Sequence, residues 1–169
     1  MTTFAIMTAV ASLVIFAGWL ALCIRKFGWL KSYSAYSTKW DEGGQGGLWT
    51  FATVISALLF VPAMLEAGDE SPLQFLGFFA PVYLIVVAFT PKWESDRKQK
   101  LIHNIGSVVC VVCIVLWLVY ALRLWYYIPI AIALAAIAAY CTRTWKESYT
   151  LWLELAMFAA AYGAVLIGG

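Results

Sequence analysis

Long uncharged runs alternate with short charged connections along almost the whole chain. Each run holds about the 20 apolar residues that an α-helix needs to cross the hydrocarbon core of a bilayer. The runs lie at about residues 4–24, 48–65, 73–90, 101–122, 127–142 and 149–167. The pattern therefore predicts an all-α polytopic integral membrane protein, with six transmembrane helices in a single domain over residues 1–169.

Composition supports a membrane rather than an aqueous environment. Of the 169 residues, 64% are apolar and 12% are charged, whereas roughly a quarter of the residues of a soluble domain are charged. Eleven basic and nine acidic residues give a net charge of +2, which is too small and too balanced for a nucleic-acid-binding surface. Membrane lipids are the expected partners, and nucleic acid is not.

Basic residues gather in alternate connections. Ten of the eleven lysines and arginines lie in the first, third and fifth connections, and Arg123 is the exception. Because basic residues next to a span stay on the cytoplasmic side, these three connections are predicted to be cytoplasmic. Both termini are then predicted to lie outside.

The first connection carries aromatic residues at helical spacing. With intervals of 4, 3 and 4 residues, four of them share one face of a helix: Trp29, Tyr33, Tyr36 and Trp40. This spacing predicts an interfacial amphipathic helix over about residues 28–41, with the four rings at the membrane interface. The alternative is that the rings anchor a cytoplasmic re-entry or pack on the bundle.

Few ionisable residues lie within the runs, and each is a candidate for function because charge is costly inside a membrane. Glu154 lies in the sixth span and His103 near the start of the fourth, both at the cytoplasmic end, so we expect them to meet. Ser107 and Cys110 share the face of His103. These four residues are predicted to line a ligand-binding cavity.

Purely structural roles for His103 and Glu154 also stay open. His103 would then be a hydrogen-bonded residue near a helix start. Glu154 would reach toward Arg143 or Lys146 at the membrane surface.

The motifs of several enzyme classes are missing. Cys110 and Cys113 form C-x-x-C inside a span, where they are most simply small apolar residues. The single histidine can supply neither two axial haem ligands nor the three histidines of membrane zinc hydrolases. No nucleotide-binding or serine-hydrolase motif occurs. The sequence thus predicts no metal and no other cofactor, and it identifies no catalytic residue.

Three stretches carry a family resemblance: residues 31–37, residues 60–66 continuing through 74–78, and residues 101–106. They resemble a group of small six-span bacterial membrane proteins of the type met in Bacteroidetes, for which no activity is known. The likeness covers about the first two thirds of the chain. It implies six helices and a bacterial inner membrane, and it transfers no functional residue.

The leading functional hypothesis is a protein without enzymatic activity that binds or transports a small or lipid-like solute through a cytoplasmic-side cavity. One alternative is an enzyme that modifies lipid head groups at the inner leaflet, with His103 as its base. Another is an assembly or scaffold subunit whose aromatic connection docks a partner. A homo-oligomer is compatible with each of them.

Overall fold

The computed structural model describes residues 1–168, and over these residues it contains helices and connections but no strand. The all-α prediction is therefore confirmed. The helices are α1 (Thr3–Phe27), α2 (Ala35–Glu42), α3 (Gly46–Ala67), α4 (Phe75–Ala88), α5 (Arg97–Leu116), α6 (Tyr127–Cys141) and α7 (Trp145–Gly168), and a π-helical turn, η1 (Trp117–Ala121), continues α5.

Four helices are long and apolar enough to cross a membrane: α1, α3, α5 with its π-helical extension, and α7. The other two predicted spans are shorter, because α4 has 14 residues and α6 has 15. At both ends of α4, before Phe75 and around Thr90, residues that the apolar pattern predicted to be helical form turns instead. By length and composition, the structure thus supports four of the six predicted spans.

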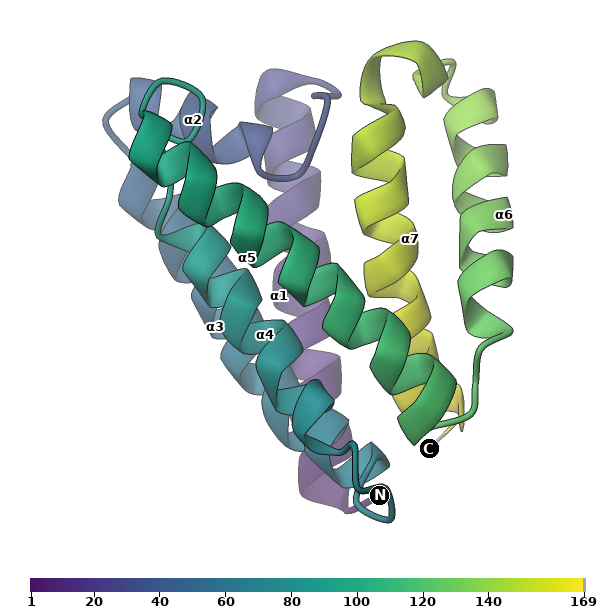
Figure 1. Ribbon diagram of the computed structural model, residues 1–169. Helices are drawn as coiled ribbons and strands as arrows, with labels where there is room; N and C mark the ends of the chain where they lie inside the picture. The colour runs from purple at the N-terminus through teal and green to yellow at the C-terminus, as the bar shows by residue number, and fades with distance from the viewer. Residues whose placement is uncertain (169) are drawn as a thin grey trace.

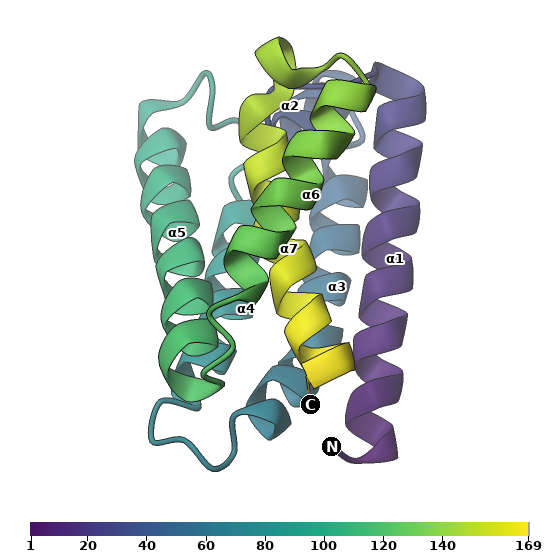
Figure 2. The same ribbon diagram turned by 90° about the vertical axis from the view of Figure 1, so that its right-hand side faces the viewer.

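The helices form a bundle with a peripheral hairpin. α3, α4 and α5 lie side by side, and α1 packs on α3 (Figure 1). α7 lies across the space between α1, α3 and α5, and α6 packs along the outside of α7 (Figure 2). The N-terminus and the end of α7 lie at one end of the bundle, and α2 covers the other.

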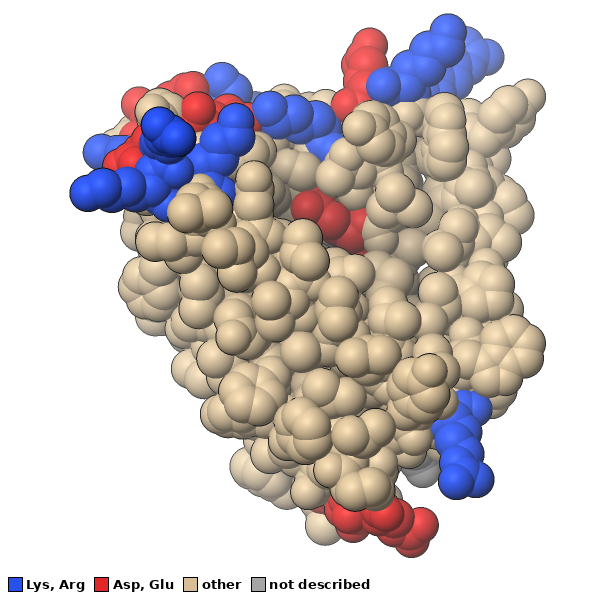
Figure 3. All heavy atoms as spheres, viewed as in Figure 1, with Lys and Arg blue, Asp and Glu red and all other residues tan. Residues whose placement is uncertain are grey.

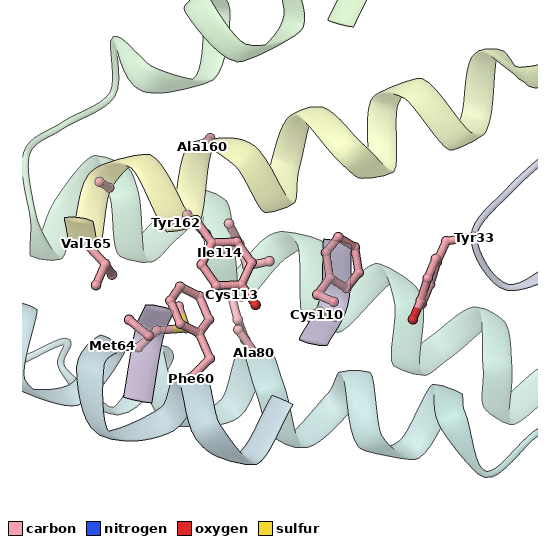
Figure 4. Packing of buried hydrophobic residues seen from close by; sticks show 14 of the residues in the cluster. Tyr33, Phe60, Met64, Ala80, Cys110, Cys113, Ile114, Ala160, Tyr162 and Val165 are labelled. Carbon is pink, nitrogen blue, oxygen red and sulfur yellow. The ribbon is translucent and has the colours of Figure 1, made fainter. Parts of the chain in front are cut away.

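Aromatic and aliphatic side chains from α3, α5 and α7 point toward one another in the middle of the bundle (Figure 4). The rings of Phe60 and Tyr162 lie 4.1 Å apart between centroids. Ile114 and Val165 are buried beside them. Since lipid tails are as apolar as these side chains, close packing rather than exclusion of water holds α7 to the other helices.

The connection between α1 and α2 differs from its prediction. α1 ends at Phe27 because Gly28 has a φ of 74°, a left-handed conformation that favours glycine. Residues 28–34 form turns rather than regular helix, and α2 begins only at Ala35. The predicted interfacial helix over residues 28–41 is therefore wrong in its extent.

The aromatic side chains of this connection also face inward. Tyr33, Tyr36 and Trp40 are buried, and Trp29 is half-buried. Their partners are other rings: Tyr33 packs on Phe16 at 5.2 Å, Trp40 stacks on Trp19 at 5.1 Å, and Trp29 stacks on Trp152 at 4.9 Å between centroids. The alternative that the rings pack on the bundle is confirmed, and placement of these rings at the membrane interface is not.

Charged side chains gather at the two ends and leave the visible middle almost free of charge (Figure 3). The connections that carry ten of the eleven basic residues all lie at the end covered by α2. We call this the basic end. At the opposite end lie the end of α3 with Glu66, the following connection with Asp69 and Glu70, and the connection before α6 with Arg123. Figure 3 shows acidic and basic side chains at this end.

Candidate functional site

Three of the four predicted site residues line one cavity near the basic end. Ser107 and Cys110 come from α5 and Glu154 from α7, around a space of about 50 Å³. The remaining lining comes from the connection before α2, from α4, and from further positions of α5 and α7: Tyr33, Ser34, Leu84, Val87, Val111 and Phe158. The prediction that these polar positions share an inward-facing cavity is thus supported by the structure.

The carboxylate of Glu154 is held by backbone rather than by a basic side chain. The backbone N–H of Tyr33 donates to Oε2 of Glu154 at 2.5 Å. One turn earlier on α7, the N–H of Leu151 donates to the carbonyl oxygen of Lys31 at 2.9 Å. These two bonds fix residues 28–34 against the start of α7.

No basic side chain pairs with Glu154 within residues 1–168. The ion pairs of this range are those of the Met1 amine with Glu66, Lys31 with Glu94, and Lys39 with Glu42. The expected alternative, in which Glu154 reaches Arg143 or Lys146, is therefore not what the structure shows. Oε1 of Glu154 has no protein donor among the described residues.

Buried hydroxyl groups continue from this cavity into the bundle. The hydroxyl of Tyr33 lies 3.0 Å from Oγ1 of Thr53. Burial raises the pKa of the Tyr33 hydroxyl above its usual value, so the phenol stays protonated. Deeper in the bundle, Oγ of Ser12 lies 2.6 Å from the hydroxyl of Tyr162 and donates to the carbonyl oxygen of Ser56.

A second cavity of about 30 Å³ lies among these hydroxyl groups. Thr53, Ser56 and Tyr162 contribute to its wall, which is otherwise mostly apolar. It shares Leu84, Cys110 and Phe158 with the cavity at Glu154. The two cavities are therefore neighbours, separated by single side chains.

His103 is buried but lies apart from this arrangement. Its Nδ1 is 2.9 Å from Oγ1 of Thr90, and its ring stacks on Trp93 with 4.5 Å between centroids. Within residues 1–168, no hydrogen bond or ion pair joins His103 to Glu154. The prediction that they meet is wrong. Residues 89–96 fold over the start of α5, and Thr90 and Trp93 of this connection are the partners of His103.

The same connection closes the cavity toward the basic end. Nζ of Lys31 lies 2.5 Å from Oε1 of Glu94, and Nε1 of Trp93 donates to the carbonyl oxygen of Ser34 at 3.3 Å. Since Ser34 lines the cavity, these contacts join residues 28–34 to residues 89–96 above it.

On its side, the cavity reaches the surface of the bundle. Val111 lines the cavity and is also 40% exposed. Glu154, which lines the cavity from α7, is itself partly exposed. We call this surface between α5 and α7 the flank.

The cysteines form no bonded pair within the described chain. Cys110 and Cys113 are both buried and free, Cys23 is buried, and Cys141 is exposed. Residues 1–168 contain no group of three or more His, Cys, Asp or Glu side chains that could hold a metal ion. The site must therefore be understood from its carboxylate, hydroxyl and thiol groups.

Comparison of the chain with protein-family models, with curated proteins and with solved structures gives no match. The resemblance to small six-span bacterial proteins accordingly stays a prediction. Function has to be argued from the geometry of the cavity.

Several cavity residues were outside the predicted set. The sequence predicts Tyr33 at the membrane interface and gives Ser34 no role, yet both line the cavity beside Glu154. Hydroxyl side chains within apolar runs, such as Ser12 and Tyr162, are a signal that sequence reasoning could have used. The placement of residues 28–34 had no such signal, because it depends on contacts with α7.

Proposed function

We propose that this protein is an integral membrane protein that binds, and carries across the membrane, a small or lipid-like solute at the cavity beside Glu154. The observation that supports this function is the convergence of Glu154, Ser107 and Cys110 on one cavity, where one carboxylate oxygen has no protein donor within residues 1–168. Intramembrane carboxylates characteristically mark solute or ion pathways. The neighbouring cavity, which has a mostly apolar wall with Thr53, Ser56 and Tyr162 in it, continues this space toward the middle of the bundle.

We also propose that α4 and α6 cross the membrane, so that the chain has six crossings with both termini outside. α4 lies between α3 and α5, and α6 runs alongside α7 (Figure 1). With 14 residues, α4 is about 21 Å long at 1.5 Å per residue, and adjoining turns extend it toward the membrane surfaces. The basic end then faces the cytoplasm, which for a bacterial protein places it in the inner membrane.

The two alternative functions gain no support from the geometry. An enzyme with His103 as its base needs that imidazole in the cavity, whereas it bonds Thr90 and stacks on Trp93. A scaffold that docks a partner through the aromatic connection needs exposed rings, whereas Tyr33, Tyr36 and Trp40 are buried. Binding of a solute is the function that uses the residues in their observed places.

Photolabelling in nanodiscs tests this function. Three long-chain alkyl probes, each with a photoreactive diazirine and an alkyne tag, would carry an ammonium, a carboxylate or a hydroxyl head. Labelled peptides of α5 and α7 are quantified by mass spectrometry. We expect at least one probe to label the lining of the cavity, and Ser107→Trp to reduce that labelling severalfold by filling the space.

The matched control is Val112→Trp, which adds the same side chain to an exposed position of α5. It should leave labelling of the cavity unchanged. Ser107→Leu, a milder change, covers the case in which the tryptophan variant fails to fold. If all three probes label the cavity peptides equally in wild type and in both Ser107 variants, the proposed function is overturned.

A further inference from the structure

The charge of the cavity is unbalanced. Glu154 is the only ionisable carboxylate in the lining, and none of the lining residues is basic. The basic residue of the adjoining residues 28–34, Lys31, already pairs with Glu94. Because an uncompensated carboxylate is costly away from water, a cation that binds here is favoured by charge-assisted hydrogen bonding. An anionic head group would instead be repelled.

The size of the cavity limits what can enter it. A volume of about 50 Å³ is far below the roughly 300–1,000 Å³ of pockets that enclose a whole organic ligand. It accommodates a head group of the size of an ammonium ion with a water molecule. Any larger portion of the ligand must therefore lie outside the cavity.

The surroundings show where that portion can lie. Toward the basic end, the contacts of Lys31 with Glu94 and of Trp93 with Ser34 cover the cavity. Toward the flank, the partly exposed Val111 forms its rim. Val108 of α5 and Leu153 of α7 are exposed apolar side chains on these same helices. The outlet of the cavity is thus apolar on the side of the flank.

We infer that the ligand is an ammonium-headed amphiphile that enters from the bilayer between α5 and α7, places its head at Glu154 and leaves its apolar tail along the flank. This inference rests on the proposed function and specifies its ligand class. Oε1 of Glu154, which has no protein donor within residues 1–168, receives a hydrogen bond from the ammonium group. Ser107, which lies in the same lining, completes its polar surroundings.

The ammonium probe described above tests this inference directly. In wild type, we expect it to label α5 and α7 at the flank more strongly than the alkanol probe of equal length. Glu154→Gln should lower labelling by the ammonium probe about tenfold, which corresponds to about 1.4 kcal/mol. The alkanol probe should be unaffected. Glu147→Gln is the matched control, because it makes the same change at an exposed position in the first turn of α7.

Competition between ammonium ions of different chain length tests whether the apolar tail contributes to binding. A long-chain alkylammonium should displace the ammonium probe at concentrations at which ethylammonium does not. Equal potency of the two competitors would overturn entry from the bilayer. Equal labelling by the ammonium and alkanol probes, or an ammonium signal that Glu154→Gln leaves unchanged, would overturn the ligand class. In these cases a loss of labelling in Ser107→Trp would still support the proposed function, so the two failures are distinguishable.

Discussion

Gly77 allows α4 to approach α3 closely. A Cβ atom at this position would lie 2.9 Å from Nε1 of Trp117 and 3.0 Å from the carbonyl oxygen of Met64. Gly18, in the middle of α1, offers a contrast, because a Cβ atom there would have no neighbour within 4 Å. The two glycines therefore respond differently to an added methyl group.

Gly77→Ala should lower the free energy of unfolding by about 1–3 kcal/mol, because the methyl group meets backbone of α3 that cannot easily move. Gly18→Ala should leave stability unchanged or raise it by up to about 1 kcal/mol, since alanine favours helix. Reversible unfolding in mixed micelles measures both. A Gly77→Ala variant as stable as the Gly18→Ala variant would show that α3 and α4 are less closely packed than described.

The hydrogen bond between Tyr33 and Thr53 should contribute measurably to stability. Tyr33→Phe leaves the buried hydroxyl of Thr53 without its partner, and we expect a loss of about 1–2 kcal/mol. Adding Thr53→Val should cost less than the sum of the two single changes. Tyr126→Phe, at an exposed position, is the control in the same unfolding assay. Additive losses would contradict a direct bond.

At the scale of residues, sequence reasoning identified part of the site. Glu154, Ser107 and Cys110 were predictable because polar groups within an apolar run stand out. His103 was predicted from the same rule, but its observed partners, Thr90 and Trp93, were not. The rule places a residue on a helix face and says nothing of a connection that folds over it, as residues 89–96 do.

At the scale of elements, the connection over residues 28–34 shows why periodicity can mislead. The aromatic spacing of 4, 3 and 4 fits a helix, yet the left-handed Gly28 ends α1 and residues 28–34 form turns. The rings are instead placed by separate partners on α1 and α7. Such contacts between distant elements leave no periodic signal in a sequence.

Hydrogen exchange in nanodiscs should show that residues 28–34 are fixed. The N–H of Tyr33 is bonded to Glu154, so a peptide covering this segment should be protected from exchange, as should one covering residues 43–45, whose N–H groups are bonded to carbonyl oxygens of α2. Glu154→Ala removes the acceptor and should speed exchange at residues 28–34 while leaving residues 43–45 unchanged. Exchange at residues 28–34 that Glu154→Ala leaves unchanged would show that the segment is not held by α7.

At the scale of the whole molecule, the number of crossings decides which connections share a side of the membrane. Residues 69 and 95, in connections, flank α4, and residue 123 in a connection and residue 146 at the start of α7 flank α6. Apolar pattern alone predicted six spans, but the length of each helix depends on where turns begin. The residues at which each helix begins and ends are determined by tertiary contacts at both ends of the bundle.

Labelling of single cysteines with a membrane-impermeant maleimide should reveal six crossings. In a background without the four native cysteines, Asp69→Cys and Arg123→Cys should react in intact spheroplasts. Ser95→Cys and Lys146→Cys should react only after permeabilisation. Reaction of residues 69 and 95 from the same side would show that α4 does not cross, and the same result at residues 123 and 146 would apply to α6.

The bond between Tyr33 and Glu154 joins positions 121 residues apart, and this has a consequence for biogenesis. A chain that is inserted helix by helix during translation presents residues 28–34 long before α7 leaves the ribosome. Until then, the buried aromatic rings of this connection lack Trp152 and the backbone of α7 as partners. Insertion of the last helix therefore completes the first connection, and a nascent chain truncated before α7 should expose those rings to membrane quality-control proteases.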